Sequence, residues 1–205
     1  MQMKRYLHIL IVISVMCLTP APASAKLGVS LGADLGFDCY SNLKYADFYP
    51  THFTGNFYVS YAIGEDWHLG AAASRTKIYF VGLGSATGVG HYSIPLYDIG
   101  PILSYMVWNG MNRRAGLWLK PSLRYVWGDM YDDTEQCNRL GTYKGYNARF
   151  NVCVDYGVLE MQFGYDFSNI ELHDVAMKEA WFQRWRLNTL DLSGPNVSVG
   201  LNVGL

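Results

Sequence analysis

The sequence predicts an all-β protein, an eight-stranded antiparallel up-and-down transmembrane β-barrel, and three observations lead to it. Apolar and polar residues alternate strictly in eight segments, which is the period of a strand with two different faces. The connections between these segments alternate between short and long. The composition is 15% aromatic and only 16% charged with 21 glycines, yet no stretch after residue 25 is apolar for long enough to form a membrane helix.

The first 25 residues are expected to be a secretory signal peptide that is removed from the mature protein. A basic pair at positions 4 and 5 precedes an apolar run too short to span a bilayer, and an A-x-A sequence ends at Ala25. The alternative is a lipoprotein signal at Cys17, although the bulky Met16 precedes that cysteine. Residues 26–205 then form one barrel domain, and their 14 basic and 17 acidic residues (net charge −3) predict no contact with nucleic acid.

The first four segments differ in how cleanly they alternate. Lys26 to Asp38 has leucine, valine and phenylalanine on one face and mainly glycine, serine and aspartate on the other. His52 to Ile63 follows the same rule, with aromatic and β-branched residues on its apolar face. Trp67 to Ser74 is weaker because its residues are small, and the pattern allows it to continue through Phe80. Ser93 to Val107 alternates but contains two prolines, each of which removes a ladder donor.

The last four segments are clearer. Ala115 to Trp127 opposes leucine, tyrosine and tryptophan with lysine, serine and arginine. Residues 147–156 and 158–167 form a hairpin with a very short turn near Tyr156-Gly157, and each strand has an apolar face and a polar face. Asn196 to Leu205 alternates most cleanly, with valine and leucine against asparagine, serine and glycine. The segments have roughly the 9 to 11 residues that a tilted membrane strand needs.

The connections provide a second, independent argument for a membrane barrel. Long connections are expected at residues 39–51, 75–92, 129–142 and 168–195, and short ones at residues 64–66, 108–114 and 156–157. Outer-membrane barrels have short periplasmic turns and long extracellular loops, and an even number of strands returns the chain end to the periplasm.

The charged residues of the strands lie on the face opposite the aromatic residues. A charge turned toward lipid near the midplane costs about 2 to 4 kcal/mol, so this face is expected to point into the barrel. Its members are Asp34, Asp98, Lys120, Arg124, Arg149, Asp155, Glu160 and Asp166. An eight-stranded barrel is filled by its own side chains, so these groups are expected to pair with one another, and a narrow gated conduit is the alternative. The residues expected in aromatic girdles at the two membrane interfaces are Phe37, Tyr61, Trp67, Tyr105, Trp108, Tyr125, Trp127 and Phe167.

The signal peptide, the eight alternating strands, the element Ile94-Pro95-Leu96 and the final strand NVSVGLNVGL together resemble the small outer-membrane β-barrel proteins of the OmpX and OmpA-barrel type. The resemblance covers the whole mature chain. It implies the bacterial outer membrane, insertion by the barrel-assembly machinery, and loops that contact extracellular partners or lipopolysaccharide. Many members end in phenylalanine, from which Leu205 departs. We expect a monomer.

Residues with recognisable chemistry are sparse, and no catalytic, cofactor-binding or metal site is predicted. Cys39 and Cys137 both fall in expected outer loops, where a disulfide can form, whereas Cys153 is expected to be buried in the lumen. The four mature histidines lack metal-ligand spacing, although His52, His91 and His173 can be drawn together above the rim.

Two expected loops contain sequence patterns that suggest a further structure or function. The glycines around Gly82 lack the strand and helix context of a phosphate-binding loop, so a surface loop is expected there. Residues 174–186 repeat apolar residues at helical spacing, which fits an interfacial helix, packing over the barrel mouth or a partner-binding surface.

Three classes of function compete. The first is a non-enzymatic barrel that supports the envelope or binds a partner through its loops. The second is a small pore or transporter, suggested by the charged lumen. The third is an enzyme resembling the outer-membrane lipid A deacylases, which use a His-x-Ser pair with a carboxylate. His91-Tyr92-Ser93 is the one such pair, but Ile94 stands where that family has asparagine.

Overall fold

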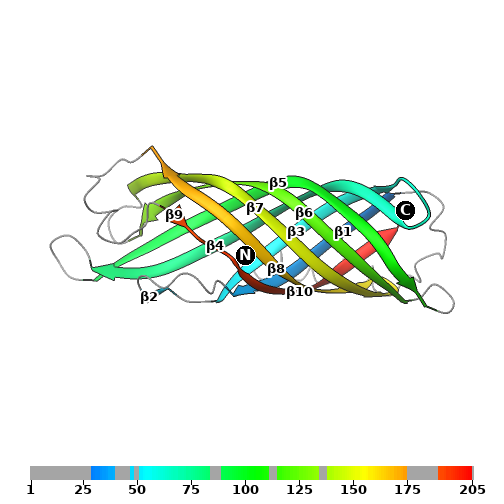
Figure 1. Ribbon diagram of the computed structural model, residues 1–205. Coiled ribbons are helices and arrows are strands. Elements are labelled where there is room, and N and C mark those ends of the chain that lie inside the picture. The colour runs from blue at the N-terminus through cyan, green and yellow to red at the C-terminus, as the bar shows by residue number, and fades with distance from the viewer. Residues whose placement is uncertain are drawn as a thin grey trace, which may run out of the picture.

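The computed structural model describes residues 29–39, 47–48, 51–83, 89–110, 115–133, 138–174 and 189–204, and these form strands joined by short turns (Figure 1). The strands are β1 (Val29–Cys39), β2 (Asp47–Phe48), β3 (Thr51–Ala62), β4 (Trp67–Leu83), β5 (Val89–Asn109), β6 (Ala115–Asp132), β7 (Asn138–Tyr156), β8 (Leu159–His173), β9 (Thr189–Leu190) and β10 (Gly194–Gly204). Among the described residues, no helix is long and apolar enough to cross a membrane. The expected signal peptide, the expected helix in 175–186, Cys137 and Leu205 lie outside these ranges.

The eight long strands close into a ring, which confirms the predicted eight-stranded antiparallel barrel. Consecutive long strands pair antiparallel from β1 through β8, and β8 pairs with β10. The ring closes because β10 also pairs with β1, from Ser30 opposite Gly204 to Asp38 opposite Asn196. Every long strand therefore has two neighbours, and the barrel has no unpaired edge of the kind that costs free energy in lipid. The two short strands are additions at the rim, where β2 pairs with β4 and β9 with β8.

The two ends of the barrel differ, as Figure 1 shows. At one end, which we call the turn end, the described connections at residues 63–66 and 157–158 are short, and the C-terminus lies beside them (Figure 1). The β7–β8 hairpin turns through Gly157 and Val158, because Tyr156 pairs directly with Leu159. Gly157 has φ of +63°, a conformation that glycine adopts without steric cost, as the first position of a two-residue hairpin turn requires. At the opposite end, which we call the loop end, the strands extend furthest, as β4 and β5 do.

The strands at the loop end are longer than the sequence predicted. β4 continues to Leu83 and β5 begins at Val89, so most of the connection expected at 75–92 is a paired hairpin. β7 begins at Asn138 and β8 continues to His173, so parts of the connections expected at 129–142 and 168–195 are also strand. The prediction of long loops was wrong for these residues, because their alternation continues with its polarity reversed. The alternative continuation of the Trp67 segment through Phe80 is confirmed.

This reversal of polarity is clear along β8. Nearer the turn end, the lumen side carries Glu160 and Asp166, each 1% exposed, while Phe163 points outward. After Phe167 the two faces exchange character: Ile170 is buried inside at 1% exposure, and the outward residues become polar. A wall that is apolar outside and polar inside suits lipid, and the reverse arrangement suits water. The barrel therefore has an apolar outer band toward the turn end and a water-facing extension at the loop end.

Candidate functional site

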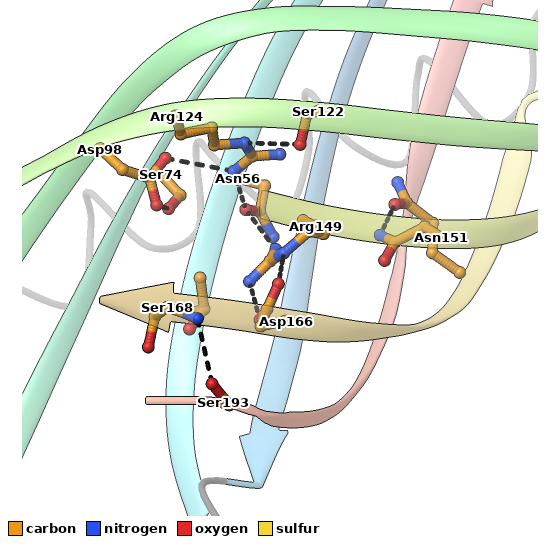
Figure 2. A network of polar contacts seen from close by, with 12 residues as sticks. Asn56, Ser74, Asp98, Ser122, Arg124, Arg149, Asn151, Asp166, Ser168 and Ser193 are labelled. Atoms are coloured by element: carbon orange, nitrogen blue, oxygen red, sulfur yellow. Dashed lines mark hydrogen bonds and ion pairs between the residues drawn. The ribbon is translucent and has the colours of Figure 1, made fainter. Parts of the chain in front are cut away.

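The lumen of the apolar band is filled by one connected network of polar side chains. At its centre, Arg149 binds both carboxylate oxygens of Asp166, with Nε 2.6 Å from Oδ1 and Nη2 2.7 Å from Oδ2 (Figure 2). The same guanidinium donates from Nη1 to Asn56 Oδ1 at 3.1 Å, and Arg124 donates to that oxygen at 3.2 Å. Arg124 also pairs with Asp98 at 3.2 Å. Two arginines thus share one amide oxygen while each has its own carboxylate.

The network continues toward the turn end through a third carboxylate, that of Asp34. Asn56 donates to Asp34 Oδ1 at 2.6 Å, and Gln162 donates to Asp34 Oδ2 at 3.0 Å. Gln162 also donates to Glu160, which forms an ion pair with Lys120. The hydrogen bonds therefore run without interruption from the arginine pair to this lysine.

Tyr58 completes the Lys120–Glu160 pair. Its hydroxyl donates to Glu160 Oε2 at 2.7 Å and accepts from Lys120 Nζ at 2.9 Å, while Lys120 lies 4.4 Å from the centre of its ring. The tyrosine reaches the lumen axis because Gly32 lies directly opposite it on β1. A Cβ at Gly32 would lie 1.9 Å from Tyr58 Cζ, so the site requires glycine.

Every long strand contributes to this network, and the network is nearly balanced in charge. Its buried members include the cations Lys120, Arg124 and Arg149 and the carboxylates Asp34, Asp98, Glu160 and Asp166. Further contacts come from Ser74 on β4, which donates to Asp98, and from Asn202 on β10, which donates to Glu160 Oε2 at 3.2 Å. Buried charges are tolerated when each has an opposite charge and its remaining lone pairs are hydrogen-bonded. The predicted pairing is confirmed for Lys120 with Glu160, Arg124 with Asp98 and Arg149 with Asp166. Asp34 is bound instead by the side-chain amides of Asn56 and Gln162.

Above the polar network, toward the loop end, the lumen is filled by an apolar cluster that we call the apolar cap. Its members are Ile78, Tyr92, Ile94, Leu96, Val126, Met130, Leu140, Tyr143, Ile170, Leu190 and Leu192, none more than 5% exposed. These side chains come from β4 to β9 and from the segment before β10. The short strand β9 places Leu190 in the cap by pairing Leu190 with Ile170. The cap has the composition of the core of a soluble protein.

The two layers leave little space between them. A cavity of about 20 Å³ lies at their junction, lined by residues of both layers such as Arg149 and Leu96. This volume is about that of a single water molecule. At this level, side chains of β4 to β8 and Leu192 therefore leave room for about one water molecule among the described residues.

Below the network, the lumen widens into a vestibule that opens toward the turn end. Its volume is about 220 Å³, and Lys120 and Tyr58 line it on the side of the network. Asp155 Oδ2 accepts a hydrogen bond from Trp118 Nε1 at 3.0 Å, and the ring of His68 meets that of Trp118 edge-on at 5.2 Å. Asp155 is only partly buried, unlike the other predicted lumen charges.

The remaining sequence-predicted residues fall in several places. Cys153 is fully buried in the lumen, as predicted, and the side chain of Cys39 lies outside the described residues, so the Cys39–Cys137 bridge stays a prediction. Within the described ranges, no group of histidine, cysteine and carboxylate side chains is arranged to hold a metal. The aromatic girdle residues Tyr61, Trp67, Trp108, Tyr125, Trp127 and Phe167 are exposed on the outer wall.

The His-x-Ser pair lies at the rim, in the extended part of β5. Ser93 is 2% exposed, and its hydroxyl donates to Asp133 Oδ1 at 3.0 Å. The backbone N–H of Asp133 donates to the carbonyl of the exposed His91 at 2.8 Å. The carboxylate therefore binds the serine directly. A nucleophilic serine instead needs its hydroxyl on a histidine, with the carboxylate behind that ring.

Sequence reasoning found the lumen charges but not the apolar cap. The alternation that predicts a strand was followed only while apolar residues occupied the outward face. The signal that marks the cap is the exchange of faces, as in β4, where Ser74 and Thr76 precede Ile78 on the lumen side and Arg75 and Lys77 follow Ala73 outside.

Comparison with known proteins supports the fold. No family model and no curated protein matches the chain. Among solved structures, Neisserial surface protein A (NspA) is similar with a TM-score of 0.50 and 18% identity, covering 87% of this chain and 97% of that one. Ail, the attachment invasion locus protein of Yersinia pestis, matches with a TM-score of 0.43 and 8% identity over 85% of this chain and 96% of that one. The chain has the fold of the small outer-membrane β-barrel proteins of the OmpA and OmpX type.

Proposed function

We propose that this protein is a monomeric barrel of the bacterial outer membrane, secreted through its signal peptide and inserted by the barrel-assembly machinery. Its role is non-enzymatic: the closed barrel anchors a β-sheet extension that carries loops beyond the membrane, for envelope support or for binding a partner. The observation that carries this proposal is the plugged lumen, in which all eight long strands contribute to one polar network beneath the apolar cap.

The outer wall supports the membrane location. The outward side chains on β6 from Leu117 to Trp127 are all apolar and span ten residue steps, which at about 3.3 Å per residue and a tilt of about 40° is about 25 Å along the axis. That height matches the apolar band of outer-membrane barrels, which is about 25 Å tall. Trp67 and Tyr105 lie at the turn end of this span with ring centres 4.4 Å apart, as expected for an interfacial girdle.

The extension beyond the band supports the role of the loops. β4 and β5 remain paired out to Leu83 opposite Val89, eight residues past the pair of Arg75 and Tyr97. The apolar cap fills the interior of this extension, so it is a packed structure that can hold the connecting loops away from the membrane surface.

The two alternatives have weaker support. A pore would need a continuous aqueous path, whereas the described lumen is blocked first by ion pairs and then by apolar side chains. A lipid A deacylase would need an accessible serine activated by a histidine, whereas Ser93 is buried and bonded to Asp133.

Conductance in planar bilayers separates the closed barrel from a pore. The full-length mature protein, refolded in detergent and reconstituted, is expected to give no channel events, while a general porin added to the same membrane gives them. Steady conductance steps from the protein alone would overturn the closed-barrel proposal. Unchanged lipid A mass on expression is expected as well, and a loss of one acyl chain would favour the enzyme.

The location and the role of the extension are tested in cells. The protein is expected in the outer-membrane fraction, with heat-dependent gel mobility and protease cleavage at the cell surface. A variant joining Val81 to His91, which are directly paired, by a two-residue turn removes the end of the hairpin but keeps the band and Tyr92 of the apolar cap. If the role is envelope support through the barrel, cells carrying this variant exclude a hydrophobic dye as the parent does. If the hairpin itself mediates the role, the variant fails to complement a deletion strain.

A further inference from the structure

One side of the outer wall carries cations among aromatic rings. Arg75, Tyr97, Trp127 and Lys144 are directly paired across four adjacent strands, β4 to β7, and we call these four residues the cationic row. All four side chains are exposed on the outside of the barrel. The row therefore places a positive charge at each end of two aromatic rings.

The rings of the row form a continuous platform. Tyr97 and Trp127 stack with centres 6.1 Å apart, and Trp127 stacks on Tyr125 at 5.9 Å. Arg75 lies over Tyr97, with Cζ 5.6 Å from the ring centre. Beside the row, Lys77 Nζ lies 4.7 Å from the ring centre of Tyr79. Contact with ring faces holds these two cations close to the barrel wall.

Among the described residues, the cations of the row and Lys77 have no carboxylate partner. Within the described part of the chain, Arg75, Lys77 and Lys144 form no ion pair. The carboxylate of Asp129 is already engaged, because it binds Arg139 at 3.2 Å and accepts a hydrogen bond from Thr142 at 2.6 Å.

Two further carboxylates lie near the row. Arg139 also binds Asp174, and this hydrogen bond raises the pKa of Arg139 above the usual value of an arginine. Glu171 lies opposite Lys144 across the β7–β8 pair and is the one carboxylate directly facing the row. The outward side chains described on β10, β1 and β3 carry no charge, so the positive surface is confined to one side of the barrel.

The level of the row on the wall identifies its surroundings. Along β6, the outward residues are Leu123, Tyr125 and Trp127, followed by Asp129, so the row lies where the apolar band ends. An open hollow of about 430 Å³ lies between Trp127 and Lys144 on this wall. In a membrane protein, this level is that of the lipid headgroups at the loop end.

We propose that the cationic row, with Lys77, binds the phosphate groups of a phosphorylated glycolipid in the outer leaflet. Arg75 and Lys77 hold one phosphate and Lys144 holds another, while the sugar between them covers Tyr97 and Trp127. Guanidinium and ammonium groups bind phosphate through charge-assisted hydrogen bonds, which are stronger than neutral ones. The inference rests on the proposed membrane location and adds a ligand to the barrel wall.

The test uses the full-length mature protein in nanodiscs of zwitterionic phosphatidylcholine. Bound lipid is counted by native mass spectrometry during titration with bis-phosphorylated lipid A. Dephosphorylated lipid A and phosphatidylglycerol are titrated in parallel, because they separate a phosphate monoester on a sugar from any anionic lipid. The expected result is preferential retention of bis-phosphorylated lipid A.

Substitutions in the row and beside it are expected to change lipid A binding in opposite directions. Lys144→Gln is expected to weaken lipid A binding about tenfold, as the loss of one charge-assisted contact of about 1.5 kcal/mol implies. Arg75→Gln has a similar effect, and Arg75→Lys retains most of the binding. Glu171→Gln is the matched control: it also removes one charge and is expected to strengthen binding.

Equal retention of dephosphorylated lipid A or phosphatidylglycerol would overturn the proposal, as would unchanged binding by Lys144→Gln. Heat-dependent gel mobility shows that each variant is folded. A folded protein that fails these titrations refutes the glycolipid site alone. A protein absent from the outer-membrane fraction refutes the location itself.

Discussion

The polar network and the apolar cap fill the same barrel by opposite means. Around the network, the wall is apolar outside and the interior holds Arg149, Asp166 and their partners. Around the cap, the interior holds Ile94 and Ile170, and the outward residues of β8 are polar. The strands β4 to β8 contribute to both regions without a break. The difference shows that the polarity of the interior depends on that of the outer wall. Where the wall is apolar outside, the interior is polar, and where the wall is polar outside, the interior is apolar.

Physically, the two regions remove different groups from water. In the proposed membrane location, lipid covers the aliphatic and aromatic residues of the apolar band, so the polar residues of the alternating pattern must lie inside and satisfy one another. In the extension, water covers the wall, so burial of apolar side chains in the cap supplies the stabilisation. The cap thus resembles a soluble core placed on top of a membrane barrel.

The largest expected effect follows removal of one cation from the network. Arg149→Ala leaves Asp166 buried without its cation and also removes the hydrogen bond that Arg149 donates to Asn56 Oδ1. Together these losses are expected to lower the free energy of unfolding by about 4 kcal/mol. Urea titration of the protein folded into lipid vesicles measures this change. Phe150→Leu, at the neighbouring outward position, is the control and is expected to cost about 1 kcal/mol. A small effect of Arg149→Ala would mean that water enters the network.

Truncation in the cap comes next. Ile94 is fully buried, and Ile94→Ala is expected to cost about 3.5 kcal/mol because it leaves a cavity in a packed apolar site. The same urea titration measures it, with Val154→Ala on the outer wall as the control of a smaller side-chain loss. An equal loss in the two variants would contradict a packed core at the loop end.

The boundary between the regions is tested from outside. Phe163→Arg places a charge in the apolar band and is expected to cost about 3 kcal/mol, whereas Asn169→Arg, on the same face of β8 beyond the boundary, costs about 0.5 kcal/mol. Folding yield and unfolding free energy in vesicles measure both. Similar costs for the two variants would move the membrane boundary past Asn169.

The smallest effect is expected from a single hydroxyl of the network. Tyr58→Phe removes the hydrogen bond to Glu160 but leaves the Lys120–Glu160 pair in place, so it costs about 1.5 kcal/mol. Gly32→Ala is the steric counterpart, because its Cβ displaces the whole ring of Tyr58 and costs more. If Gly32→Ala is the milder change, the ring moves without loss of the network.

The sequence alone predicted the barrel and which side chains face its lumen. Alternation with period two assigns Arg124, Arg149 and Glu160 to one face, and the cost of charge in lipid turns that face inward. The same reasoning allowed β4 to continue through Phe80, as it does, but missed the extension of β5, because it took the end of the outward apolar residues for the end of that strand.

Alternation along one strand contains no information about which residues of distant strands meet across the lumen. Tyr58 and Glu160 are 102 positions apart, and closure of the ring together with Gly32 brings their side chains together. The register between strands likewise aligns Arg75, Tyr97, Trp127 and Lys144 in one row. Sequence determined which face of each strand meets lipid, since solvent acts on each residue locally. Only the tertiary structure decided the partners, since pairing across a barrel depends on register and closure of the whole ring.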